Sequence, residues 1–189
     1  MEKDLAKLIA IQDFTLRFDE YTEIAGSATV HLWMSCADKN DMDVTVQIRK
    51  IDTNGKLLEH LNYPCPVPVE EVPNVNVAKT LGPQGFLRAS HAISRDPSQP
   101  GIFYKHDRAE TIEPGKIVLL EIQLWPMGMV FAANEGIVLK IAGHDMLYPE
   151  VGFLQSNEPE DENVGTHQVH TGGQYDSCLT LPIIAPAKS

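Results

Sequence analysis

Apolar and polar residues alternate one by one along two early segments of the chain. In residues 30–35, valine, leucine and methionine alternate with histidine, tryptophan and serine, and residues 44–49 repeat the pattern with valine and isoleucine. A period of two places the apolar side chains on one face of a β-strand and the polar ones on the other. The pattern predicts two half-buried antiparallel strands, joined by a polar turn at residues 36–41.

Further short apolar segments follow, and helical spacing is nearly absent after the first dozen residues. Asn54-Gly55 favours a tight hairpin turn because both residues tolerate a positive φ, so two hairpins are expected, one at residues 30–49 and one here. The later segments with strand character are residues 86–89, 117–125, 137–142, 166–169 and 178–184. This number of strands predicts an all-β fold, a β-sandwich or jelly roll.

Two stretches interrupt the strand pattern. The first, residues 64–83, carries Pro64, Pro66, Pro68, Pro73 and Pro83. Proline lacks a backbone donor, so this stretch is expected to be an extended connector and not part of a ladder. The second, residues 147–165, contains the acidic run 158–162, whose like charges favour a solvated loop. No internal repeat is visible, and one core is expected.

Composition excludes several classes of function. The chain has 189 residues, and 15 Lys and Arg against 26 Asp and Glu give a net charge of −11. This charge repels phosphate backbones and anionic lipid, so neither nucleic acid nor a membrane is an expected partner. The amino terminus lacks the apolar stretch of a secretory signal, which favours a cytoplasmic location. The three cysteines, Cys36, Cys65 and Cys178, are far apart, and free thiols are expected.

The sequence contains no motif of a serine hydrolase active site. A nucleophile elbow needs Gly-x-Ser-x-Gly, and no serine has glycines at both flanking positions. Ser90 and His91 are adjacent, but neighbours on a strand point to opposite faces, so they do not form a nucleophile–base pair there. The chain is expected to be inactive alone; if it were active, Ser90 and Ser177 would be the first nucleophiles to test.

Two groups of polar residues have some of the character of a metal site. His167 and His170, with Asp176 nearby, lie on a predicted strand, where residues three apart face opposite sides. The oxygen-rich turn consists of Asp38, Asn40, Asp41 and Asp43. Its calcium-loop pattern breaks at Met42, and its bidentate position falls on Arg49. No metal and no cofactor is therefore expected, while a weak calcium site at this turn stays open.

The two tryptophans suggest a ligand platform. Trp33 and Trp125 fall on predicted strands, and Trp33 lies on the nominally polar face. An exposed indole can stack on a sugar ring or on a partner protein. Packing under a loop is the commoner fate of a tryptophan on a sheet, and both interpretations stay open.

Several segments together resemble one known family. Gly85-Phe86-Leu87-Arg88-Ala89-Ser90-His91 resembles the Gly-x-Leu-Arg-Ala-Ser-His-Arg block in the carboxy-terminal domain of Xaa-Pro dipeptidyl-peptidases and cocaine-esterase-type (CocE/NonD) serine hydrolases. Further segments similar to that domain are residues 13–15, 20–26, 41–46, 113–126 and 170–177. The resemblance covers roughly residues 12–186.

The resemblance implies a galactose-binding-like jelly roll at residues 12–186 that carries no catalytic residue. In this family the domain follows an α/β-hydrolase domain that holds the catalytic triad. Residues 1–11 would then be a segment or linker from a missing catalytic domain, and residues 187–189 a tail. Such a module would pack on the hydrolase domain, shape its substrate cleft and support homo-oligomerisation. The expected interface residues are Arg88, His91 and Arg95.

Two alternatives belong to other classes of protein. A free-standing carbohydrate-binding module would show sugar-dependent quenching of Trp33 or Trp125 fluorescence. A structural interaction domain would bind protein partners and no small ligand.

Overall fold

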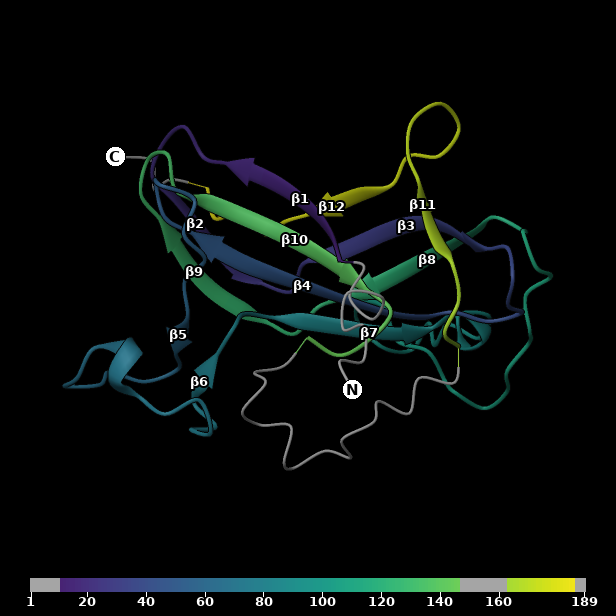
Figure 1. Cartoon of the computed structure of the whole chain (residues 1–189), viewed down its shortest axis with the longest axis horizontal. Helices are drawn as coiled ribbons and strands as arrows, with labels where there is room; N and C mark the ends of the chain where they lie inside the picture. The colour runs from purple at the N-terminus through teal and green to yellow at the C-terminus, as the bar shows by residue number, and fades with distance from the viewer. Residues whose placement is uncertain (1–10, 147–162, 186–189) are drawn as a thin grey trace, which may run out of the picture.

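Two antiparallel sheets face each other in the computed structural model, which describes residues 11–146 and 163–185 (Figure 1). The first sheet has the order β1 (Gln12–Arg17), β10 (Gly136–Ala142), β4 (Asp43–Ile51) and β7 (Gln84–Arg88). The second sheet is centred on β3 (Thr29–Cys36). On one side β3 pairs with β8 (Val118–Gln123), and on the other with β11 (His167–His170) and β12 (Cys178–Thr180) in succession.

Short elements complete the sandwich. β2 (Thr22–Gly26) pairs with β9 (Met127–Phe131), and β5 (His60–Leu61) pairs with β6 (Lys79–Thr80). The described residues include the 3-10 turns η2 (Val69–Glu71) and η3 (Ala89–His91). The segment from β5 to β6 extends away from the sandwich at one end (Figure 1). The described residues include no helix long and apolar enough to cross a membrane.

The core lies between the two sheets and follows the alternation of the sequence. Inward residues of β3 and β4 are almost fully buried, among them Val30, Leu32, Val46 and Ile48. Leu120 and Ile122 of β8 and Leu139 of β10 pack in the same cluster. The predicted all-β jelly-roll sandwich is confirmed. The predicted half-burial of the strand at residues 44–49 is wrong, because Thr45, Gln47 and Arg49 on the polar face of β4 are buried as well.

One of the two predicted hairpins is wrong. β3 and β4 do not pair; they lie in opposite sheets, and residues 37–42 cross from one sheet to the other. Both strands have one apolar face, so facing each other across the core buries both faces as well as side-by-side pairing would. The hairpin at Asn54-Gly55 is confirmed: Gly55 has φ 87°, and the bridge Ile51↔Leu57 closes the turn.

The two predicted irregular stretches have different outcomes. The proline-rich stretch 64–83 is mostly irregular, but its end forms β6 and the start of the link to β7, so a ladder is present where only a connector was predicted. Thr80 and Lys79 supply this short ladder because they follow the last closely spaced proline, Pro73. The acidic run 158–162 lies outside the described residues.

Candidate functional site

The two most specific sequence segments meet at one corner of the first sheet. Asp43 on β4 is paired in register with Arg88 on β7. The Arg88 guanidinium donates from Nε to Asp43 Oδ1 at 2.7 Å and from Nη2 to Oδ2 at 3.3 Å. Asn163 donates a third hydrogen bond to Oδ2 at 2.9 Å. The guanidinium of the Arg-Ala-Ser-His block and the Asp43 carboxylate of the Asp-x-Asp strand therefore neutralise each other.

Asp41 holds the backbone of the same corner. Its Oδ1 accepts the backbone N–H groups of Met42 and Ser90, both at 2.9 Å. Ala89 N–H donates to the Met42 carbonyl at 2.8 Å, and the side chain of Ser90 is 2% exposed. Ser90 is thus a buried structural serine, and its hydroxyl is not presented to a substrate.

The predicted interface residues lie at the end of β7 (Arg88), on η3 (His91) and in the loop after it (Arg95), and each has a different partner. Arg88 pairs with Asp43 as described, and His91 Nδ1 lies 3.3 Å from Nδ1 of His106. Arg95 donates to Glu121 at 3.3 Å and to the Gly101 carbonyl at 3.4 Å. The structure does not join the three into one patch of side chains, and their interface role stays a prediction.

The acidic side chains of the oxygen-rich turn, where a weak calcium site stayed open, have separate contacts. Asp38 Oδ1 accepts the Thr166 N–H at 2.9 Å, and this hydrogen bond, with that of the Cys36 thiol, lowers the pKa of Asp38. Asp41 and Asp43 are engaged in the corner just described. Among the described residues, no group of three or more His, Cys, Asp or Glu side chains could hold a metal ion.

His167 and His170 lie on opposite faces of β11, as the strand period predicts. His167 Nε2 donates to the Asn163 carbonyl at 3.0 Å. His170 Nε2 lies 2.8 Å from Ser35 Oγ, and its ring packs 5.5 Å from that of Tyr175. The Ser35–His170 contact was not predicted, because a diagonal pair across β3 and β11 is visible only once the register is known.

The Ser35–His170 pair and Ser177 lack the geometry of a hydrolase. Ser35 is buried, so a substrate carbonyl has no access to its hydroxyl. The Ser177 hydroxyl accepts the Trp33 backbone N–H at 2.9 Å and donates to the His170 carbonyl at 2.7 Å. Ser177 therefore closes the interrupted ladder between β11 and β12 and has the role of a structural serine.

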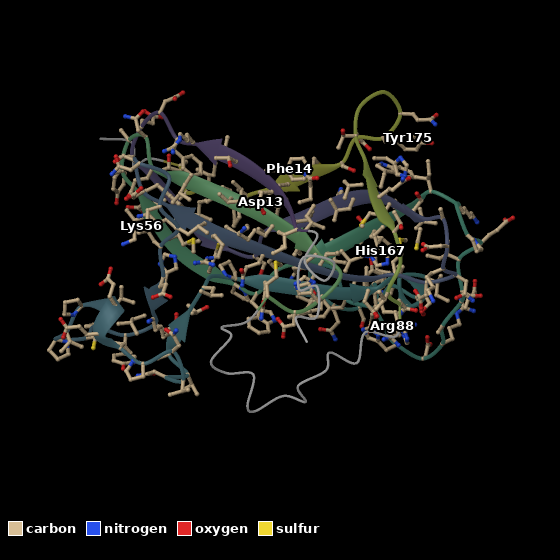
Figure 2. The ribbon with its side chains drawn as sticks, in the orientation of Figure 1. Asp13, Phe14, Lys56, Arg88, His167 and Tyr175 are labelled. Carbon is tan, nitrogen blue, oxygen red and sulfur yellow. The ribbon has the colours of Figure 1, made fainter. Side chains whose placement is uncertain are left out.

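Trp33 is held by the loop between β11 and β12. Its indole Nε1 donates to Asp176 Oδ1 at 2.9 Å, and its ring lies 5.6 Å from that of Tyr175. The hydrogen bond from Trp33 lowers the pKa of the Asp176 carboxyl. Trp33 is thus packed against a loop rather than displayed; Figure 2 shows Tyr175 in this loop.

Trp125, unlike Trp33, is exposed to solvent. It follows β8, is 58% exposed and packs 6.2 Å from the ring of Phe86. Trp33 is paired with Leu119 on β8, and Trp125 is six residues farther on, about 20 Å along an extended chain. The two tryptophans are therefore separate sites and not one platform.

An apolar groove of about 230 Å³ lies between β1 and β12, where the edges of the two sheets stay apart. Phe14 and Leu16 of β1 pair with Leu139 and Ile137 and share their inward face, yet they are 42% and 47% exposed. Figure 2 shows Phe14 between β1 and β12. Val169, Leu179 and Leu181 line the opposite wall. This groove was not predicted, since it depends on which strands occupy the sheet edges.

Similar solved structures extend well beyond this domain. Two crystal structures of a CocE/NonD family hydrolase from Staphylococcus aureus have TM-scores of 0.74 and 0.75 and 28% identity, and they match 92% and 93% of this chain. The chain spans only 30% of the length of that hydrolase.

More distant structures share the fold. An aminopeptidase from a marine sediment Thaumarchaeota archaeon has a TM-score of 0.59 and 17% identity, over 93% of this chain and 26% of its own. An α-amino acid ester hydrolase has a TM-score of 0.58 and 14% identity, over 92% of this chain and 25% of its own. No curated protein matches the sequence.

The family comparison covers the corner at Asp43 and Arg88. The sequence model of the X-Pro dipeptidyl-peptidase C-terminal non-catalytic domain matches residues 10–180. These residues include both the Asp-x-Asp strand and the Arg-Ala-Ser-His block. The chain belongs to the family of X-Pro dipeptidyl-peptidase C-terminal non-catalytic domains.

Proposed function

We propose that this chain packs as a carboxy-terminal jelly roll on the catalytic domain of a serine hydrolase of the α/β-hydrolase type. In that position it shapes the substrate cleft from outside and supports oligomerisation. The parent enzyme would act on Xaa-Pro peptides or on acyl esters. The observation that carries the proposal is that the family model covers residues 10–180, while the chain spans only 30% of the Staphylococcus aureus hydrolase.

The groove between β1 and β12 is the face proposed to contact the catalytic domain. Phe14 and Leu16 expose apolar surface that a free domain would leave in water, at a cost of roughly 25 cal/mol for each Å². The groove is open to solvent, and its lining is mostly aliphatic and aromatic. The occupant proposed is the catalytic domain, because the Staphylococcus aureus hydrolase carries about 70% of its length outside the matched 30%.

The first test measures catalysis by the chain itself. We expect no hydrolysis of a chromogenic short-chain ester or of an Xaa-Pro anilide, and no label from a serine-reactive phosphonate. The physical reason is that Ser90 is buried and the Ser177 hydroxyl is engaged with backbone groups. Turnover with stoichiometric labelling would overturn the proposal, and Ser35, Ser90 and Ser177 would then be replaced in turn.

The second test separates docking from folding. Phe14→Gln is introduced into the isolated domain and into the full hydrolase, with Val130→Gln on β9, an exposed apolar residue outside the groove, as the control. We expect the isolated domain to keep most of its stability, since Phe14 is already 42% exposed. The full enzyme should lose turnover or its oligomeric state. An unchanged full enzyme would show that the groove is not the contact face.

The predicted interface role of the arginines is better tested at Arg95 than at Arg88. Arg88→Ala would also break the pair with Asp43, so a loss of function would have two explanations. Arg95 is a cleaner choice because its side chain is half exposed and its contacts are at 3.3 Å or longer. We expect Arg95→Ala to weaken association of the two domains and to leave the folding of this domain unchanged. Unchanged association would remove Arg95 from the interface.

A further inference from the structure

A cavity of about 250 Å³ lies beside Trp125 and shares no lining residue with the β1–β12 groove. Three segments form it: β5 with Asn62, the end of β6 with the turn before β7, and residues 125–129. These segments are far apart in the sequence and meet where β9 begins. Its volume lies just below the range of drug-sized sites and suits a single small ring.

The lining carries no formal charge. No Asp, Glu, Lys or Arg contributes to it, although the chain has a net charge of −11. His60 is the titratable group of the wall, and burial, followed by the nearby charges of Lys50 and Arg49, lowers its pKa, so the imidazole is neutral at neutral pH. A charged ligand would lose hydration here without gaining a direct ion pair, since Lys50 and Arg49 lie outside the lining. The cavity therefore selects a neutral ligand.

Polar groups of the wall have unused hydrogen-bonding capacity. The Asn62 side-chain amide is exposed and has no hydrogen-bond partner among the described residues. The Thr80 hydroxyl accepts the Gly82 N–H at 3.1 Å and donates to the Gly82 carbonyl only over a long 3.5 Å contact, which a ligand oxygen could replace. His60 Nε2 is also without a partner within the described part of the chain. Hydroxyl groups of a ligand would satisfy donors and acceptors of this kind.

An aromatic surface lies beside these polar groups. Trp125 lines the cavity with an indole that is 58% exposed, and the Phe86 ring 6.2 Å away supports it. Gly128 adds room, because a Cβ built on it would meet nothing within 4 Å. A flat apolar surface next to neutral donors and acceptors fits a ligand that has one apolar face and a hydroxylated edge.

We propose that this cavity binds one ring of a neutral sugar, with the C–H face of the ring on Trp125 and its hydroxyls toward Asn62, Thr80 and His60. A single ring on one indole gives weak binding, with a Kd on the order of 1 mM. The proposal does not depend on the contact with the hydrolase domain, because the two surfaces use different residues.

The test follows each tryptophan separately. The chain has two tryptophans, so labelling with 5-fluorotryptophan gives two ¹⁹F signals, assigned through Trp33→Phe and Trp125→Phe. D-galactose, D-glucose and N-acetyl-D-glucosamine are titrated in turn, with D-glucuronate as the charged comparison. We expect at least one neutral sugar to shift the ¹⁹F signal of Trp125 saturably and to leave the Trp33 signal unchanged. The affinity for glucuronate should be at least fivefold weaker. No saturable shift with any of them, or a shift of Trp33 alone, would overturn the proposal.

A variant that fills the cavity is compared with a matched control outside it. Gly128→Leu places a side chain in the open space, and we expect binding at least tenfold weaker. Val130→Leu enlarges a side chain at the next outward position of β9, outside the cavity, and should bind as the wild type does. If Gly128→Leu fails to fold, Asn62→Ala replaces it, since that amide has no contact to lose, and binding should weaken at least threefold. Unchanged binding in the folded variant would show that the cavity is not the site.

Discussion

The two edges of the sandwich differ in how the sheets meet. At the β7–β8 edge, Trp125 N–H donates to the Gln84 carbonyl at 3.0 Å. Gly85 lies so close to β8 that an added Cβ would be 2.6 Å from the Gln123 carbonyl oxygen. At the β1–β12 edge the sheets stay apart, and Phe14 and Leu16 line an open groove. The domain is thus closed along one edge and open along the other.

This difference separates two roles of apolar residues in one fold. At the closed edge, apolar side chains are buried by the domain's own strands and contribute to its stability. At the open edge, residues with the same inward orientation stay half exposed, because β11 and β12 together cover less of the first sheet than β1 and β10 present. Their burial requires a partner, which is why the groove is the face proposed to contact the hydrolase domain.

The largest expected effect contrasts one aliphatic residue from each edge. Ile122 on β8 is almost fully buried, and Ile122→Ala should lower the free energy of unfolding by about 3 kcal/mol. Leu16→Ala on β1 removes a side chain that is 47% exposed and should cost about 1 kcal/mol. Urea denaturation of both variants measures the difference. Equal losses would show that the β1 edge is closed in solution.

A substitution at Gly85 tests the close approach of β7 and β8. In Gly85→Ala the new methyl group would be 2.6 Å from the Gln123 carbonyl oxygen and 3.0 Å from Ile122, so backbone must shift. We expect a loss of about 2 kcal/mol in the free energy of unfolding, as for other overpacked sites. Gly128→Ala is the control, since its Cβ would meet nothing within 4 Å. Wild-type stability of Gly85→Ala would mean that the closed edge is looser than described.

On the open side of the sandwich, the Ser177 hydroxyl connects β3 and β11 of the second sheet. In Ser177→Ala, the Trp33 N–H and the His170 carbonyl lose their shared hydroxyl. We expect a loss of about 1 kcal/mol, the typical net value for such a hydrogen bond, and a change in Trp33 fluorescence. Ser177→Thr keeps the hydroxyl and should restore both values. Equal stability of Ser177→Ala and the wild type would contradict this bridging role.

The smallest expected effect is a response of the same loop to acid. Trp33 holds the pKa of Asp176 below its ordinary value of 3.8, so the folded state favours the carboxylate more than the unfolded chain does. The associated stabilisation is present above pH 3.8 and is lost as the pH falls through the folded-state pKa. Trp33 emission should change in that range in a Trp125→Phe background. Asp176→Asn should abolish the step, and a step that persists would have another origin.

Short-range patterns in the sequence were enough for the family and for seven strands, while β1, β2, β5, β6 and β9 were not among the predicted segments. The alternation in residues 30–35 and 44–49 predicted β3 and β4, because a period of two has one physical meaning on a half-buried sheet. The block at residues 85–91 identified the family, and no serine has the flanking glycines of a nucleophile elbow. These features depend on neighbouring residues only.

Contacts between distant segments were beyond the reach of sequence patterns. Alternation states that a strand has an apolar face, but it does not state which strand lies beside it or across from it, so β3 and β4 were wrongly predicted to pair. For the same reason, the sequence did not reveal that the Asp-x-Asp strand and the Arg-Ala-Ser-His block contact each other. Asp43 and Arg88 were both noted, and their ion pair appeared only with the register of β4 and β7.

The amino-acid sequence by itself determined the all-β class, seven of the strand segments, the family and the absence of a nucleophile elbow, since each follows from local order along the chain. Tertiary structure alone decided that Trp33 is covered by a loop while Trp125 is exposed beside a neutral cavity. It also decided that one edge of the sandwich is closed and the other open. The physical reason is that burial depends on the order and length of the strands in both sheets, and residues far apart in the sequence set that order together.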